Sequence, residues 1–474
     1  MTRTDRPAGP ASRRQLLGWA ATAAALPSSG VLTGCAFGGS DDSPKAERGA
    51  KTANNPFGVG QNTSLEVVVF KGGYGDAYAK EGHGPLFEQA FPGVNTEITS
   101  AQRIATTIQP RFVGGNPPDV VDNEGEAMDV GALVQDGQLS DLTPLLDAPT
   151  VDDPGRKVRD ILLPGTVESG TVDGTLYQLP YLNTLYGLWY DAAMFEAKGW
   201  QPPITWDDFV DLSKEIKSAG IDPFGLAGKN AVYYITNVIL TSMIKLGGDT
   251  VRKDIDNLSP GAWRAPAVEE ATHRWHEYAA TYIDRNYMGQ EHTVAQLRQV
   301  LGKLAFYPCG SWLENEMKKD TPKDFRFAVT AVPSLTAKDK LKADAYQVSP
   351  SEPFAVPAKA KNPAAGMEYI RQMLSRKGVQ GFIERTGGSV SVVDATEGMD
   401  LPPGARSAAD ALGSASTLIA PFNYPKWYKE LDTEINTAVG ELVAGRARPK
   451  EFMDRLQGAA DRVKKDPSVK KFRA

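Results

Sequence analysis

Cysteine and histidine are scarce in this sequence. Only Cys35 and Cys309 occur among 474 residues, and two of the four histidines, His273 and His276, form an H-x-x-H pair. Two cysteines make no disulfide framework, so the fold must rest on a large buried core, which a chain of this length supplies most naturally as two domains. Two histidines are too few ligands for a zinc site, so the sequence predicts no metal.

The chain also lacks an excess of positive charge. It has 52 Lys+Arg against 58 Asp+Glu, which gives a formal net charge of −6. Surfaces that bind nucleic acid are basic, because they neutralise phosphates. We therefore expect no nucleic-acid partner.

Motifs for phosphate binding and for nucleophilic catalysis are missing too. In the loop KGGYGDAY, a tyrosine, Tyr78, stands where a dinucleotide-binding G-x-G-x-x-G needs its third glycine, and no P-loop lysine follows. A G-x-S-x-G elbow is absent. The sequence thus predicts a binding protein with no catalytic residue and no cofactor. Acidic residues are too numerous for any pair to identify a glycoside hydrolase, and that class stays open as an alternative.

An apolar run long enough to span a bilayer is absent, but a targeting segment is present. Arginines at positions 3, 6, 13 and 14 precede an apolar stretch over 16–32, which Pro27 interrupts and which ends at LTGC. SRRQLL resembles a twin-arginine export signal, and LTGC resembles the lipobox of bacterial lipoproteins. The resemblance implies that Cys35 is acylated and anchors the exported protein to the outer face of the cytoplasmic membrane.

Beyond the signal, the sequence predicts a tether and then a globular α/β part. Residues 35–64 are polar and glycine-rich, which is typical of a flexible tether. Short apolar runs at LEVVVF, GVNTEI and PPDVV predict strands, and a helix is expected between the first two. Strands that alternate with helices favour an α/β sheet, in which ligands bind beyond the carboxyl ends of the strands. The loops Gly73–Gly75 and Asp122–Glu126 fall at two such ends.

Later segments give two helix signatures and a crossing strand. Thr205 is placed to cap a helix that ends at Gly220, and the aromatic run 176–191 is expected to be extended chain in the interior. Apolar side chains at helical spacing recur twice, first at Ala271, Trp275, Tyr278 and Tyr282, and later at Trp427, Leu431, Ile435, Ala438 and Leu442.

Aromatic side chains near the predicted strand ends are the main candidates for a ligand site. Aromatic faces suit the C–H faces of sugar rings, while nearby amides and carboxylates bind the hydroxyls. Trp312 follows Gly310 and Ser311 at the end of an apolar run, so its indole is expected to project from a strand end. The candidates are Tyr74, Tyr186, Tyr233, Tyr234, Trp312, Trp427 and Tyr428.

An ordered series of motifs carries a family resemblance. The strings FPGV, GNPPDVV, LTPLLD, DGTLYQLPY, GLWYDAAMFEAKGWQPPITWDDF, GKLAFYPCGSW and EPFAVPAKAKNPAAGMEYIRQML span most of the chain. This series resembles the extracellular solute-binding proteins of carbohydrate ABC transporters. NPFGV, VVFKGGYGDAYAK, QPRFVGGNPPDVVDN, DLTPLLDAP and ATEGMDLPPG are similar to actinobacterial lipoproteins that bind N-acetylglucosamine and diacetylchitobiose.

The resemblance implies a two-lobed, periplasmic-binding-protein-like α/β fold with a hinge and a central ligand cleft. Its implied division is a signal at 1–34, a tether at 35–64, lobe 1 at 65–182 and 350–400, and lobe 2 at 183–349 and 401–474. It also implies a monomer that delivers sugar to a permease. Another oligosaccharide in the same role, or a scaffold lipoprotein without ligand, stays open.

Carried over by position, the resemblance also implies the sugar-binding residues. Around Trp427 the sequence matches the family pattern only weakly, so Tyr424 or Tyr428 are alternatives to Trp427 in the ligand-binding role. The residues are Lys71, Tyr74, Asn123, Glu126, Asn183, Thr184, Tyr186, Tyr233, Tyr234, Trp312 and Trp427.

Overall fold

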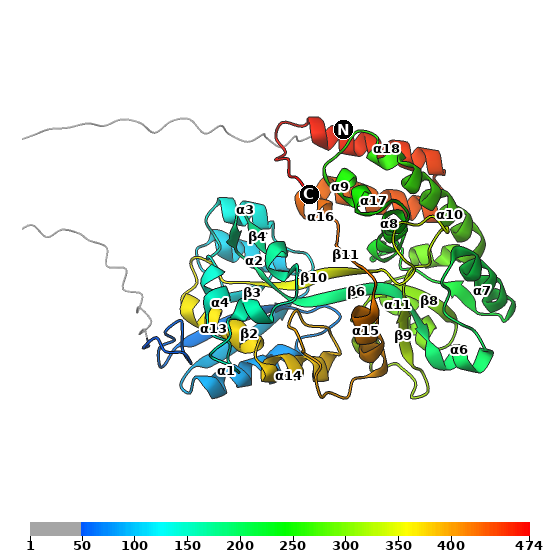
Figure 1. The fold of residues 1–474 in the computed structure, drawn as a ribbon. Helices are drawn as coiled ribbons and strands as arrows, with labels where there is room; N and C mark the ends of the chain where they lie inside the picture. The colour runs from blue at the N-terminus through cyan, green and yellow to red at the C-terminus, as the bar shows by residue number, and fades with distance from the viewer. Residues whose placement is uncertain (1–48) are drawn as a thin grey trace, which may run out of the picture. The chain divides into compact units, whose positions relative to one another are not determined.

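The computed structural model describes residues 49–474 (Figure 1). The described residues form one compact unit. The predicted export signal and Cys35 lie outside the described residues. Within the described part of the chain, no helix combines the length and the apolar character needed to cross a membrane.

A nine-stranded mixed sheet organises the fold, with the order β2-β1-β3-β10-β6-β8-β7, and with β9 paired to β6 and β11 to β10. The first three strands are parallel, while β10 is antiparallel to both β3 and β6. A small separate sheet pairs β4 (Thr171–Val172) with β5 (Thr175–Leu176). The other strands are β1 (Ser64–Phe70), β2 (Asn95–Ala101), β3 (Val120–Asp122), β6 (Leu179–Asp191), β7 (Asp222–Phe224), β8 (Leu304–Gly310), β9 (Phe327–Thr330), β10 (Tyr346–Ala355) and β11 (Leu418–Ile419).

Lobe 1 is built around β1 and its parallel neighbours, as the apolar run LEVVVF predicted. Successive side chains of a strand point to opposite faces of the sheet. Val67 and Val69 accordingly enter one apolar core, while Val68 enters a second core on the other face. The helices of this lobe are α1 (Gly84–Ala90), α2 (Ile104–Val113), α3 (Val130–Gln135), α4 (Thr143–Asp147), α5 (Thr166–Ser169), α13 (Pro363–Met373) and α14 (Arg376–Thr386).

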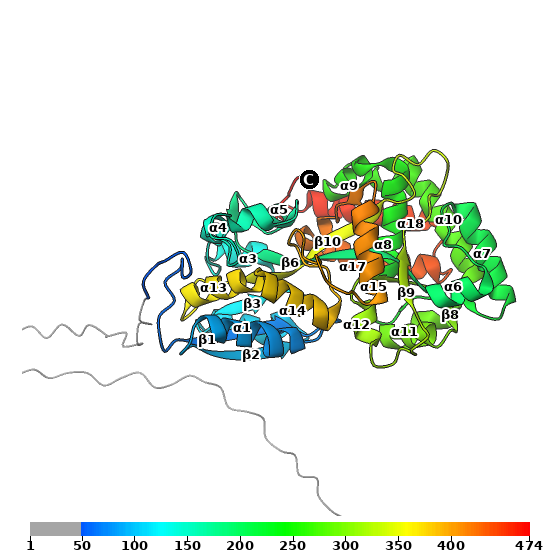
Figure 2. The same ribbon diagram turned by 60° about the horizontal axis from the view of Figure 1, so that its bottom comes forward.

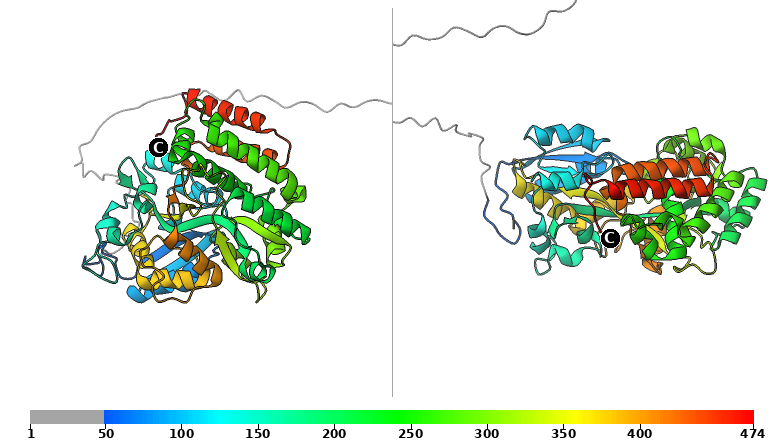
Figure 3. Two further views of the ribbon diagram at one scale, coloured as in Figure 1. Left: turned by 45° about the vertical axis from the view of Figure 1, so that its right-hand side comes forward. Right: turned by 90° about the horizontal axis from the view of Figure 1, so that it is seen from above.

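Lobe 2 is largely helical and surrounds a third, larger core. The predicted cap is present: the Thr205 hydroxyl accepts from the Asp208 N–H at 3.2 Å, and the Asp208 carboxylate accepts from the Thr205 N–H at 3.0 Å. Figure 3 shows α17 and α18 side by side. The helices are α6 (Ala192–Lys198), α7 (Trp206–Ser218), α8 (Tyr233–Gly247), α9 (Asp249–Asp256), α10 (Pro266–Tyr282), α11 (His292–Val300), α12 (Leu313–Met317), α15 (Pro403–Ser414), α16 (Tyr424–Trp427), α17 (Lys429–Val443) and α18 (Pro449–Lys465).

Two long strands join the lobes (Figure 2). On β6, Leu182 belongs to a lobe 1 core and Leu185 to the lobe 2 core, so the strand passes from one lobe into the other. The antiparallel β10 returns beside it and ends with Phe354 in the lobe 1 core. The chain crosses between the lobes a third time after Leu401, which packs on lobe 1, and it enters the lobe 2 core at Ala408.

The structure differs from the sequence prediction at the tether. Residues 35–48 lie outside the described residues, but 49–63 pack on lobe 1 instead of standing free. Val59 is 5% exposed and belongs to a lobe 1 core. The Asn55 side chain bonds both the N–H and the carbonyl of Val59, and Arg371 donates to the Asn54 carbonyl at 3.1 Å. Burial of one valine and these bonds fix a segment that its composition alone predicted to be flexible.

The late helix is also divided where an unbroken apolar stripe was expected. Tyr428 has φ −140° and ψ 77°, which is not helical, so the helix breaks between Trp427 in α16 and Lys429 in α17. Leu431 and Ile435 are buried on α17 as predicted. Trp427 lies before the break and is not part of that stripe.

Candidate functional site

Four of the predicted aromatic residues form one cluster at the junction of the lobes. Trp312 precedes α12, and its ring centroid lies 5.6 Å from that of Tyr186 on β6 and 5.9 Å from that of Tyr234 on α8. Tyr233 lies 4.5 Å from Tyr234. The expectation that Trp312 stands at a strand end agrees with its position two residues after β8.

Two glycines allow the indole of Trp312 to lie where it does. A Cβ on Gly310 would stand 2.1 Å from Trp312 Cζ3, and a Cβ on Gly73 would stand 2.5 Å from Trp312 Cδ1. Such approaches are closer than any side chain tolerates, so glycine is required at both positions while the indole stays in place. Trp312 packs against the apolar cores of both lobes. Its neighbour Gly73 lies in the lobe 1 loop after β1.

The loop after β1 bonds directly to lobe 2. The Asn315 side chain donates to the Gly73 carbonyl at 2.7 Å, and the Tyr74 hydroxyl lies 3.3 Å from Ser311 Oγ. Tyr74 is only 6% exposed, and this burial raises the pKa of its hydroxyl. Tyr74 therefore serves as a contact between the lobes in this conformation, and its ring packs on Phe382 of lobe 1.

Three side chains around this cluster are reached by solvent and yet surrounded by protein. Tyr233 is 40% exposed, but desolvation raises the pKa of its hydroxyl. Desolvation likewise lowers the pKa of the exposed Lys426 on α16 and raises that of the half-buried Glu124 after β3.

Glu124 of lobe 1 and Lys426 of lobe 2 act on one another electrostatically across the junction of the lobes. The charge of Lys426 stabilises the Glu124 carboxylate, and Glu124 in turn acts on the hydroxyls of Tyr233 and Tyr186. The aromatic cluster at the lobe junction is thus accompanied by a carboxylate from lobe 1 and an ammonium group from lobe 2. Neither residue is among the predicted sugar-binding residues, although Glu124 lies within the predicted loop Asp122–Glu126 and Lys426 directly precedes the predicted Trp427. Charged side chains are common in the sequence, so charge alone singles out neither of them.

The remaining candidates have bonding partners within the protein. Lys71 lies 3.4 Å from Asp76, and Glu126 accepts from Arg103 at 2.5 Å. The Asn123 side chain is 2% exposed and bonds the N–H and carbonyl of Met128, at 2.8 and 3.1 Å.

Two candidates lie on the crossing strand β6, and one lies on α16. The Thr184 hydroxyl lies 2.8 Å from Ser351 Oγ, and the half-buried Asn183 is paired with Pro350 of β10. Trp427 stacks on Phe472, with ring centroids 5.3 Å apart and planes 19° apart. The structure thus gathers Tyr74, Thr184, Tyr186, Tyr233, Tyr234 and Trp312 near one another.

A pair of buried acids lies where β10 meets lobe 1. Asp122 ends β3 and is fully buried, and Glu352 on β10 is 7% exposed with φ 49°, a left-handed conformation that is unusual outside glycine. Desolvation raises the pKa of Asp122 to about 7 and that of Glu352 well above its usual value. The Glu352 N–H donates to the Glu124 carboxylate at 2.9 Å, which links this pair of acids to Glu124.

Two hollows occur in the described residues, and neither is lined by Glu124 or Lys426. A cavity of about 10 Å³, room for roughly one water, is lined by Tyr186, Tyr234, Cys309 and neighbouring residues. A hollow of about 470 Å³ lies on lobe 1 between α1 and α14 and contains no residue of the aromatic cluster. The arrangement at the lobe junction, with aromatic walls and a few polar groups, is the one suited to a small polar ligand.

Comparison with known proteins identifies the family. The family described as bacterial extracellular solute-binding protein matches residues 72–380. The chain is 36% identical to the diacetylchitobiose binding protein NgcE of Streptomyces coelicolor, over 98% of this chain and 99% of that protein. The chain belongs to this solute-binding family. As a member of an extracellular family it is an exported protein, and the resemblance carried by its motifs is confirmed.

More distant relatives of this solute-binding protein share its fold. It is 23% identical to the multiple sugar-binding protein of Streptococcus mutans, over 67% of this chain and 72% of that one. A solved chitin oligosaccharide binding protein superposes with a TM-score of 0.70 at 18% identity, over 85% of this chain and 99% of that chain. RafE in complex with raffinose gives 0.68 at 18% identity, over 84% and 98%. The predicted two-lobed α/β fold is confirmed.

Proposed function

We propose that this protein captures N-acetylglucosamine or a short chitooligosaccharide such as diacetylchitobiose and delivers it to an ABC-transporter permease. The relative named for diacetylchitobiose, similar along almost its whole length, supports the ligand class. The observation that carries the proposal is the aromatic cluster of Tyr186, Tyr233, Tyr234 and Trp312 beside the oppositely charged Glu124 and Lys426.

The chemistry of this site fits an uncharged sugar. Exposed aromatic faces stack on the C–H faces of pyranose rings. Glu124 can accept hydrogen bonds from hydroxyl or acetamido N–H groups, and Lys426 can donate to hydroxyl or carbonyl oxygens. The negative charge of Glu124 and the positive charge of Lys426 act on one another. A charged ligand is therefore not required to neutralise either side chain. No bond of the sugar is made or broken in this role.

Ligand capture requires the lobes to move. In the present conformation the loop after β1 already bonds to Ser311 and Asn315 of lobe 2. Rotation about β6 and β10 would separate these contacts, and sugar bound to both walls would favour the closed form, which the permease then recognises. We further propose that the protein acts as a monomer and that acylated Cys35 holds it on the outer face of the cytoplasmic membrane.

Calorimetry and melting with a panel of sugars test the ligand class. A ligand specific for the folded state stabilises it by about 4 kcal/mol at a thousandfold excess over Kd. We expect N-acetylglucosamine or diacetylchitobiose to raise the melting temperature by several degrees and glucose to do much less, because the acetamido group needs partners once desolvated. Equal shifts from glucose would contradict the amino-sugar ligand, and no binding to any sugar would contradict the function.

The main alternative, a secreted glycoside hydrolase, differs in what happens to the sugar. Incubation of the protein with diacetylchitobiose followed by mass spectrometry should return the dimer intact. Release of N-acetylglucosamine would favour the enzyme. The anchor is tested separately: mass spectrometry of the membrane fraction should find acylated Cys35 at the N-terminus, and Cys35→Ala should release the protein into the medium.

A further inference from the structure

Helix α16, which carries Lys426, has almost no stability of its own. It is four residues long, and the non-helical Tyr428 separates it from α17. A helix this short does not form alone in water, because nucleation costs more than its few hydrogen bonds return. The position of Lys426 at the cleft must therefore depend on contacts outside α16.

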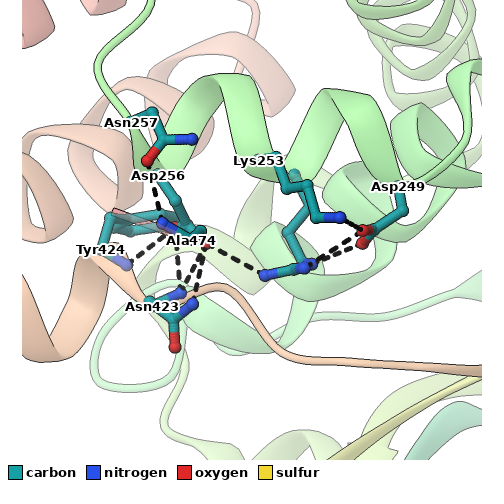
Figure 4. A network of polar contacts seen from close by, with 8 residues as sticks. Asp249, Lys253, Asp256, Asn257, Asn423, Tyr424 and Ala474 are labelled. Atoms are coloured by element: carbon teal, nitrogen blue, oxygen red, sulfur yellow. Dashed lines mark hydrogen bonds and ion pairs between the residues drawn. The ribbon is translucent and has the colours of Figure 1, made fainter. Parts of the chain in front are cut away.

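A buried carboxylate holds the beginning of α16 (Figure 4). Asp256, at the end of α9, is fully buried and accepts from the backbone N–H groups of Asn423 and Tyr424, both at 2.9 Å. The Asn423 side chain donates to it at 3.2 Å, and the Arg252 guanidinium lies at 3.3 Å. Arg252 is itself fixed by Asp249 at 2.6 Å. This network anchors one end of the short helix to lobe 2.

Residues 466–474, which follow α18, hold the other end. The ring of Phe472 stacks on Trp427, with centroids 5.3 Å apart, and its backbone N–H donates to the Tyr428 hydroxyl at 3.0 Å. The Lys470 ammonium group lies 5.1 Å from the centre of the Phe472 ring. Two residues further on, the Ala474 N–H donates to Asn257, directly after Asp256 in the sequence, at 2.9 Å.

We propose that residues 466–474 position α16 for ligand binding, with Phe472 as the positioning residue that sets Trp427 and, through it, the neighbouring Lys426. This inference rests on the proposed sugar-binding function of the cleft. Phe472 itself need not touch the sugar. It covers one face of Trp427 and so helps to fix the orientation of a helix whose other end is held by Asp256 and by the buried Tyr424.

The test combines hydrogen exchange with calorimetry on the full chain. The variants are Phe472→Ala, the conservative Phe472→Tyr, and the control Arg473→Ala, whose side chain is exposed. In Phe472→Ala we expect faster exchange of the backbone amides over 423–428 in the ligand-free protein, and roughly five- to fiftyfold weaker binding of diacetylchitobiose, which lies within the roughly five- to 150-fold range of couplings between linked sites. A fivefold loss of affinity requires that α16 occupy its binding position only about one fifth of the time. Its backbone amides would then be exposed to solvent most of the time, so their protection from exchange should nearly vanish.

The outcomes separate this inference from the proposed function. Phe472→Tyr should restore both exchange and affinity, and Arg473→Ala should match the wild type. Unchanged exchange over 423–428 in Phe472→Ala, or faster exchange with unchanged affinity, would overturn the positioning role. A wild-type protein that binds none of the sugars would instead overturn the proposed function.

Discussion

At the scale of single residues, Trp312 connects the proposed site to both lobes. Its indole touches Tyr186 of the crossing strand and Tyr234 of α8, and it lies against Gly73 of the opposite lobe. It is nevertheless only half-buried, unlike core tryptophans such as Trp275, which is fully buried. A side chain that joins both lobes and keeps an open face is well placed to stack on a ligand.

Replacing this indole should affect binding more than folding. We expect Trp312→Ala to weaken diacetylchitobiose binding by about 2–4 kcal/mol, roughly thirty- to a thousandfold in Kd. Calorimetry gives the affinity, and the melting temperature of the ligand-free protein gives the stability. If Trp312 were a packing residue, its loss would destabilise the ligand-free protein by about 3–5 kcal/mol, and affinity left intact would argue against stacking.

The residue scale also shows what the sequence could not predict. Tyr74 was placed correctly beyond the end of β1, but its hydroxyl bonds Ser311, 237 residues away in the chain. Glu124 and Lys426 lie near one another only because the two lobes meet. Local spacing predicts which residues follow a strand; it carries no information about which side chain of a loop turns inward, since that depends on contacts distant in sequence.

At the scale of elements, local signals predicted the fold well. The cap at Thr205 and the β-branched run of β1 are determined by neighbouring residues, and both appear where predicted. The expected extended run at 176–191 is β6 from Leu179 to Asp191. The break at Tyr428 was missed, because α16 is held by contacts distant in sequence, with Asp256, Phe472 and the lobe 2 core.

The junction of β3 with β10 should make stability depend on pH. In the unfolded chain Asp122 and Glu352 lose their protons near pH 4, whereas burial keeps the pKa of Asp122 at about 7 and that of Glu352 well above its usual value. The folded state then holds more protons than the unfolded one. The stabilisation is complete below about pH 4 and is lost as the pH rises toward about 7. Glu124 and the unpaired Tyr78 hydroxyl face the same pair.

A glutamine at position 352 tests this assignment. Glu352→Gln keeps the shape and can donate to Asp122 without titrating, so the decline of the melting temperature between pH 4 and 7 should become shallower by several degrees. One pKa unit corresponds to about 1.4 kcal/mol. Melting curves at intervals of half a pH unit provide the measurement, and Glu430→Gln, an exposed change on α17, is the control. Parallel profiles for wild type and Glu352→Gln would show that the buried pair does not titrate in this range.

At the scale of the whole described unit, the two lobes also meet beside the crossing strands. The loop after β1 and the β8–α12 junction bond through Tyr74 with Ser311 and through Gly73 with Asn315. These contacts join segments of different lobes, so they exist only while the lobes are closed. A change that blocks them should oppose closure and leave each core intact.

Gly73→Ala is such a change. The new Cβ would lie 2.5 Å from Trp312 Cδ1, and the backbone of Gly73 is not in the left-handed region, so alanine strains only the contact between the lobes. An overpacked contact costs about 1–3 kcal/mol, which corresponds to roughly five- to 150-fold weaker sugar binding. The ligand-free protein can open and avoid the clash, so its melting temperature should stay close to that of the wild type.

Gly289→Ala is the matched control, because a Cβ there meets open space. Small-angle scattering should show compaction on addition of sugar for the wild type and for Gly289→Ala, and less of it for Gly73→Ala at the same sugar concentration. Full affinity and full compaction in Gly73→Ala would mean that the sugar-bound form does not bring Gly73 against Trp312, and that closure follows a different path from the one these contacts define.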